Sequence, residues 1–152
     1  MNHRSLHFDT LKEAMAEAER LAVTPVQTTG NYTLGQILDH LARTIRMATG
    51  DAPPPKVPLL LRLVGPLIGG RIVKGPAKPG FKLPAGMQAY FWSKEDVPVE
   101  KAIEELRAAH QRFATMVELP RNPMFGSLSH EQTEQLQCRH FELHLGFVND
   151  AA

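Results

Sequence analysis

Two histidines four residues apart, His140 and His144, are the residues of this sequence best suited to metal chemistry. Residues four apart on a helix lie on one face, one turn above the other. The two imidazoles can therefore converge on one ion, with metal–nitrogen distances of roughly 2.0–2.1 Å for zinc. The H-E-x-x-H helix of metalloproteases uses the same spacing, although the glutamate of that motif is absent here.

The pair needs support from its surroundings, because seven histidines in 152 residues produce such a spacing by chance in about a quarter of sequences. The helical pattern places His140 near the centre of an apolar face that includes Leu136, Leu143 and Phe147, with His144 at its edge. An unpaired imidazole buried there costs free energy, which metal ligation would offset.

A third ligand can come from either of two other helices. His40 lies beside Ile37 and Thr44, at the margin of the apolar stripe of a second helical segment. His110 lies within the predicted inner face of a third segment, between Leu106 and Phe113. It can be a ligand, an acid or base, or a hydrogen-bonded core residue, and the spacing alone does not decide between them. The other histidines, His3, His7 and His130, are predicted to be exposed.

Four amphipathic segments must position these residues. Three begin with a capping box, in which a serine or threonine precedes a Glu or Gln by three residues. These pairs are Thr10 with Glu13, Thr33 with Gln36, and Ser129 with Gln132. The third segment, which lacks a capping box, is predicted to begin near residues 96–98 and to carry its apolar face as far as Val117. The fourth, which begins at Ser129, is predicted to run to about Val148. No strand pattern of comparable strength is present.

A long proline-rich connection, residues 51–91, separates the second segment from the third. Pro66 and its neighbouring glycines predict one or two short helical pieces between Leu59 and Val73, and exclude one long helix. Its alternating apolar residues and prolines predict that it packs over the other helices. From Asp51 to Tyr90 there are six basic residues and one acid. That excess could face an anionic ligand or belong to a solvated loop.

The predicted fold class is all-α, a four-helix bundle with one long proline-rich crossover between its second and third helices. Residues 1–152 are predicted to form a single domain. A net charge of +1 gives no argument for a nucleic-acid partner, and Cys138, the only cysteine, allows no internal disulfide. The apolar stretch from Val57 to Val73 is too short and interrupted to span a membrane. Without a secretory signal, a cytoplasmic location is expected.

Two motifs resemble those of the DinB-like superfamily of four-helix-bundle metalloproteins. Residues 32–41, YTLGQILDHL, are similar to its aromatic-Ser/Thr-x-x-x-Ile/Val-Leu-x-His-Leu helix start, and residues 140–147, HFELHLGF, to its closing His-x-x-x-His helix. Residues 78–84 and 122–126 resemble a branch of unknown function. The resemblance implies an up-down-down-up bundle, usually dimeric, that holds zinc or nickel through His40, His140 and His144. Many members have Gln where this chain has Phe147.

These features lead to a hypothesis of a metal-dependent enzyme, a thiol-dependent transferase, isomerase or hydrolase acting on a small molecule. His110 is the acid–base candidate, since Asp39 and Glu142 are predicted to point away from the site. The alternatives are a non-catalytic metal- or ligand-binding bundle of the stress response, and a metal-free bundle whose histidines are core hydrogen-bonding groups.

Overall fold

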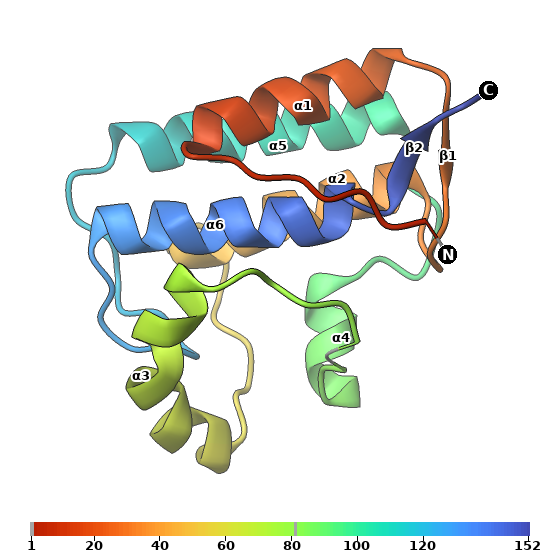
Figure 1. Cartoon of the computed structure of the whole chain (residues 1–152). Coiled ribbons are helices and arrows are strands. Elements are labelled where there is room, and N and C mark those ends of the chain that lie inside the picture. The colour runs from red at the N-terminus through yellow and green to blue at the C-terminus, as the bar shows by residue number, and fades with distance from the viewer. Residues whose placement is uncertain (1, 81) are drawn as a thin grey trace.

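The computed structural model describes residues 2–80 and 82–152, and it is mostly helical, as the all-α prediction requires (Figure 1). The helices are α1 (Leu11–Val23), α2 (Leu34–Ala48), α3 (Leu59–Lys74), α4 (Ala85–Phe91), α5 (Val99–Thr115) and α6 (His130–Leu145). Two short strands, β1 (Val26–Thr28) and β2 (Val148–Asp150), pair antiparallel. None of the helices in the described ranges is long and apolar enough to cross a membrane.

The predicted helix starts are confirmed by their caps. Thr33 accepts a hydrogen bond from the backbone N–H of Gln36, whose side chain accepts one from Thr33 N–H, and Ser129 and Gln132 repeat this reciprocal pair. The Thr10 side chain accepts from the N–H of Glu13, but the Glu13 carboxylate accepts from Asp9 N–H and not from Thr10, so this predicted capping box is only half formed. Such caps satisfy backbone donors that have no partner within the helix.

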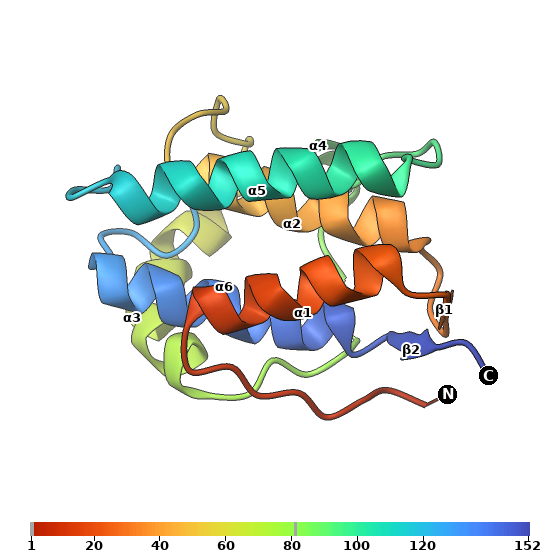
Figure 2. The ribbon, with the colours of Figure 1, turned by 90° about the horizontal axis from the view of Figure 1, so that it is seen from above.

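Helices α1, α2, α5 and α6, called here the helical core, lie side by side (Figure 2). Each of α1 and α6 runs in one direction and each of α2 and α5 in the other, as the colour gradient of Figure 2 shows. Helix α2 packs against α5 and α6, and α1 packs against the same two helices. Their buried side chains form the main hydrophobic cluster, which includes Leu11, Leu21, Leu41, Ile45, Leu106, Phe113 and Phe141.

The last helix ends earlier than its sequence predicts, at Leu145 rather than about Val148. Val148 is instead paired with Thr28 in the two-stranded sheet, and the carbonyl of Phe147 accepts a hydrogen bond from Thr29 N–H. This sheet was not predicted, because three-residue strands leave no usable alternation in the sequence. Their pairing satisfies backbone groups that a longer helix would have satisfied internally.

Helix α3 corrects a second prediction, since it continues through Pro66 as one helix of 16 residues. Proline removes one backbone donor and disfavours a helix interior. Tertiary contact outweighs that preference here. Gly65 lies against the backbone carbonyl of Met124, and Gly69 against the side chain of Phe125. A bare backbone on this side lets α3 pack closely on the turn before α6.

The connection between α2 and α5 packs only partly over the helical core, contrary to expectation. Helix α4 packs on α2, with Met87 and Phe91 buried, and α3 packs on α6, although most apolar side chains of α3 are exposed. Figure 1 shows α3 and α4 together on one side of α6. The described residues that follow α3 include all of the predicted 78–84 motif except Phe81, which lies outside the described ranges.

Candidate metal centre

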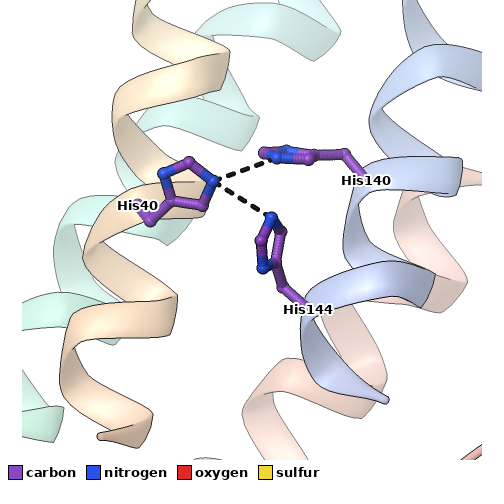
Figure 3. Close-up of side chains that lie close together, drawn as sticks. All are labelled: His40, His140 and His144. Carbon is purple, nitrogen blue, oxygen red and sulfur yellow. Dashed lines mark hydrogen bonds between the residues drawn. The ribbon is translucent and has the colours of Figure 1, made fainter. Parts of the chain in front are cut away.

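Three histidines converge between α2 and α6 (Figure 3). Nε2 of His40 lies 3.0 Å from Nε2 of His140 and 3.2 Å from Nε2 of His144. One nitrogen from each ring lies within 4.8 Å of the other two, so the cluster could hold a metal ion. The structure therefore selects His40, and not His110, as the third member of the group that the sequence left open.

The ring of His40 is fixed on both its edge and its face. It is 3% exposed, and its Nδ1 donates a hydrogen bond of 3.1 Å to the carbonyl of Phe91. The indole of Trp92 stacks on it with ring centroids 3.8 Å apart and planes at 8°. Because the proton of a neutral imidazole sits on Nδ1 when Nδ1 donates, Nε2 presents a bare lone pair toward the other two histidines.

His140 is oriented in the same way by a hydroxyl group. Its Nδ1 lies 3.3 Å from Oγ1 of Thr44, which itself donates to the carbonyl of Leu41 over 2.8 Å. When the Thr44 proton is directed at Leu41, the Thr44 oxygen accepts from Nδ1–H of His140. In that tautomer the Nε2 of His140 also carries a bare lone pair.

In these tautomers two bare nitrogen lone pairs lie 3.0 Å apart, and they repel each other unless a positive charge lies between them. Protons supply that charge poorly here. Burial lowers the pKa of His140 to about 4. Burial, reinforced by the neighbouring His140, lowers the pKa of His40 and of His144 well below the usual value of histidine. At neutral pH a divalent cation satisfies the cluster better than a proton does.

The separations also suit metal ligation. Two nitrogens that each bind one ion at roughly 2.0–2.1 Å lie about 3.3 Å apart at tetrahedral angles and about 3.0 Å apart at octahedral angles. The two separations from Nε2 of His40, 3.0 and 3.2 Å, fall in this range, and the ligand atoms of all three rings lie within 4.8 Å of one another. Three neutral imidazoles suit zinc, nickel, copper or iron, so the donor set fits a divalent transition metal without selecting one.

Aromatic side chains enclose the cluster on the side of α4, and of these only Tyr32 belongs to a motif recognised in the sequence. Trp92 stacks on Tyr32 as well as on His40, with Tyr32–Trp92 centroids 3.7 Å apart. Its edge approaches His144, and Phe91 contacts His40 edge-on. The run Tyr90-Phe91-Trp92 at the end of the proline-rich connection is the sequence signal that could have indicated this wall.

The apolar face of α6 differs from the predicted one. Cys138, Phe141 and Leu145 are fully buried in the core, whereas His140 and His144 are half-buried on the neighbouring flank that faces α2. The helix is covered on further sides because the N-terminal segment crosses it, with Phe8 N–H donating to Glu142 and Arg139 donating to the carbonyl of Phe8. A helix buried from several directions gives no single apolar stripe to locate by periodicity.

The two carboxylates set aside at the sequence level lie outside the cluster. Glu142 is buried in an ion pair with Arg139, at 2.8 Å, and Asp39 in one with Arg43, also at 2.8 Å. Neither belongs to the three-histidine group. Both carboxylates are thus engaged with arginines on their own helices.

The structure does not bring His110 into the cluster. Its side chain is half-buried on α5, where burial lowers its pKa and the charge of Glu134 acts in the opposite direction. Val117, predicted to continue that inner face, is 90% exposed because α5 ends at Thr115. Of the histidines predicted to be exposed, only His7 is so; His3 donates to the carbonyl of Leu143, and His130 to that of Phe113.

Fold and site together define a helical protein with a three-histidine cluster that could hold a metal ion. Comparison of the sequence with protein families identifies the family. The chain belongs to the family described as "Protein of unknown function (DUF1569)", whose model matches residues 1–151. No curated protein and no solved structure matches the chain.

Proposed function

We propose that this protein is a metal-dependent enzyme that binds one divalent ion, zinc or nickel, through Nε2 of His40, His140 and His144. The observation that carries the proposal is the convergence of these nitrogens, at 3.0 and 3.2 Å from Nε2 of His40, with Nδ1 of His40 donating to the Phe91 carbonyl away from the centre. Three protein ligands leave coordination positions for water or substrate, as in catalytic metal sites.

The chain's own residues hold this arrangement before any ligand arrives. The Phe91 carbonyl and the Trp92 ring fix His40, and Thr44 fixes His140. Such contacts raise the basicity of a ligating imidazole and set its tautomer. A metal bound here would act as a Lewis acid and lower the pKa of a bound water or thiol.

For the substrate we propose a small organic molecule, with a low-molecular-weight thiol as co-substrate in a transfer, isomerisation or hydrolysis reaction. The acid–base role of His110 remains a prediction from the sequence. The direction of the four core helices and their connection through residues 49–98 support a DinB-like four-helix bundle, in one domain, with a proline-rich crossover. Membership of that superfamily, a homodimeric state and a cytoplasmic location are part of the same proposal.

A non-catalytic metal- or ligand-binding role in a stress response is the second candidate, and one observation favours it. Within the described residues, no carboxylate joins the three-histidine group, and the groups that line it beside His40 are Trp92 and Phe91. A catalytic site needs a proton donor or acceptor within reach of the reacting atoms. This second role predicts stoichiometric metal without turnover of thiols and electrophiles.

Elemental analysis of protein purified without chelators tests the proposal. We expect about one divalent ion per chain in the wild type, loss of that ion in His40→Ala and in His140→Ala, and retention in His110→Ala and His7→Ala. His7 is exposed and serves as the matched control for removal of a histidine. A wild type without bound metal, or a His40→Ala variant that keeps it, would contradict the proposal.

A further inference from the structure

The outward face of α3 is the largest apolar feature that the metal centre does not use. Nine large apolar side chains are exposed in the described part of the chain, and seven of them lie on this one helix. Those seven are Leu59, Leu60, Leu63, Val64, Leu67, Ile68 and Ile72. Leu59, Leu60, Leu63 and Leu67 are between 63% and 82% exposed. Contiguous apolar surface of this kind marks a site of interaction.

The opposite face of α3 fixes which side points outward. Gly65, Gly69 and Val73 are buried and follow one another at four-residue spacing, which places them on one stripe. Gly65 and Gly69 lie against Met124 and Phe125. The helix is therefore anchored by its small residues. Because that face packs against the protein, the leucines on the opposite face are exposed to solvent.

The basic residues that accompany this face form no ion pairs within the described residues. Six basic residues accompany α3, and each of them is exposed: Lys56, Arg62, Arg71, Lys74, Lys78 and Lys82. None of the six forms an ion pair with another residue in the described ranges. By contrast, six arginines elsewhere are each within 4 Å of a carboxylate: Arg4, Arg20, Arg43, Arg46, Arg107 and Arg139.

We infer that α3 docks this protein on the surface of an anionic lipid bilayer, with its leucines among the acyl chains and its flanking lysines and arginines at the phosphates. A helix of 16 residues is about 24 Å long, which is shorter than the roughly 30 Å hydrocarbon core. It therefore lies in the interface rather than across it. Exposed apolar residues combined with unpaired cations are the features that bind helices to such surfaces.

Charge distinguishes this occupant from a second copy of the chain. A symmetric pairing of two α3 faces would bring two basic segments together. Between Asp51 and Tyr90 each copy offers six cations and one carboxylate, Asp51, which already lies beside Arg46. An anionic bilayer neutralises the cations that a second copy would repel. Docking in the interface requires no membrane-spanning helix, and none is present among the described residues.

Co-sedimentation with lipid vesicles tests this inference, and it does not depend on the metal centre. We expect the wild type to sediment with vesicles of phosphatidylcholine containing phosphatidylglycerol, and to remain in the supernatant with phosphatidylcholine alone. The double variant Leu63→Glu/Leu67→Glu should remain in the supernatant with the anionic vesicles as well. Arg71→Gln/Lys74→Gln should weaken partition to the anionic vesicles roughly thirtyfold, since each cation near the surface contributes about a factor of five.

The matched control is Val117→Glu, which places the same charge on an equally exposed valine outside α3 and should leave partition unchanged. Circular dichroism of each variant establishes that the helices are retained. Failure of the wild type to bind anionic vesicles would overturn the inference. So would equal binding by Leu63→Glu/Leu67→Glu, or a dimer in light scattering that this double variant separates, because the face would then belong to a second copy.

Discussion

The helical core and the connection that carries α3 are both built from apolar helices, yet they use their apolar residues in opposite ways. In the core, Leu41 and Ile45 are fully buried, whereas on α3 Leu63 and Leu67 are mostly exposed. Buried residues of α3 are glycines and one valine. The comparison shows that apolar composition alone does not identify which face of a helix is buried. The buried face is the one whose side chains allow the closest approach to the neighbouring segment.

Replacing one arginine in each region should give the largest difference between them in the free energy of unfolding. Arg139→Met on α6 should destabilise the protein by about 3–5 kcal/mol, because it leaves the buried carboxylate of Glu142 without its ion-pair partner. Arg71→Met on α3 should leave the free energy of unfolding nearly unchanged, since Arg71 is exposed and unpaired within the described residues. Urea unfolding followed by circular dichroism measures both. Equal losses would remove the distinction between the regions.

Leucine truncation gives the next contrast. Leu41→Ala in the core should cost roughly 2–5 kcal/mol, from lost burial and the cavity that remains. Leu67→Ala, at a side chain that is 82% exposed, should change the free energy of unfolding by less than about 0.5 kcal/mol. Thermal and urea unfolding of the two variants provide the test. A large loss for Leu67→Ala would mean that α3 is covered by a partner in solution.

The pH dependence of the metal-free protein should come from the core, because residues 51–90 contain no histidine. The pKa of His140 is about 4 in the folded protein against a usual 6.5, so the unfolded chain binds the extra proton between these values. Stability is therefore complete above about pH 6.5 and falls as the pH drops toward 4, by about 3 kcal/mol from His140.

Urea unfolding of chelator-treated protein between pH 4 and 7 measures this loss. The variant His140→Gln is the control, and its stability should depend less steeply on pH in that window. Stability that rises as the pH falls would contradict the burial of a neutral imidazole.

Alanine substitutions at two glycines should give the smallest stability changes of this comparison. The two sites are matched, because each glycine lies against a backbone carbonyl. Gly35 of α2 contacts Val97, and Gly65 of α3 contacts Met124. Gly35→Ala should destabilise the whole fold by about 1–3 kcal/mol, since it forces α2 and α5 apart. Gly65→Ala should loosen only α3, increasing amide hydrogen exchange there and leaving the urea midpoint, read by the single Trp92, in place.

Gly70→Ala is the control for both glycine variants, because nothing lies within 4 Å of a Cβ at that position. It should strengthen α3 through helix propensity, by up to about 1 kcal/mol locally. A Gly65→Ala variant that behaves like Gly70→Ala would show that α3 is not anchored through its glycine stripe.

Local signals in the sequence predicted the starts of the core helices well. Thr33 with Gln36 and Ser129 with Gln132 specify capping boxes from four consecutive residues, and these are confirmed. The buried face of α1 also follows from periodicity, since this helix has one core-facing stripe. Helix α2 is buried on most of its sides, and its apolar stripe predicts only part of that buried surface. Helix α6 was misread because it is covered by α1, by α2 and by the N-terminal segment at once.

The sequence by itself determined which residues could form the site, because the four-residue spacing of His140 and His144 is a property of any helix that contains them. Their meeting with His40, 100 and 104 residues earlier, was decided by the packing of α6 on α2. Tertiary packing also decided the hydrogen bond from His40 to the Phe91 carbonyl, the stacking of Trp92 on His40, and the continuity of α3 through Pro66. Each of these depends on contacts between segments far apart in the chain, and local propensity and periodicity carry no information on such contacts.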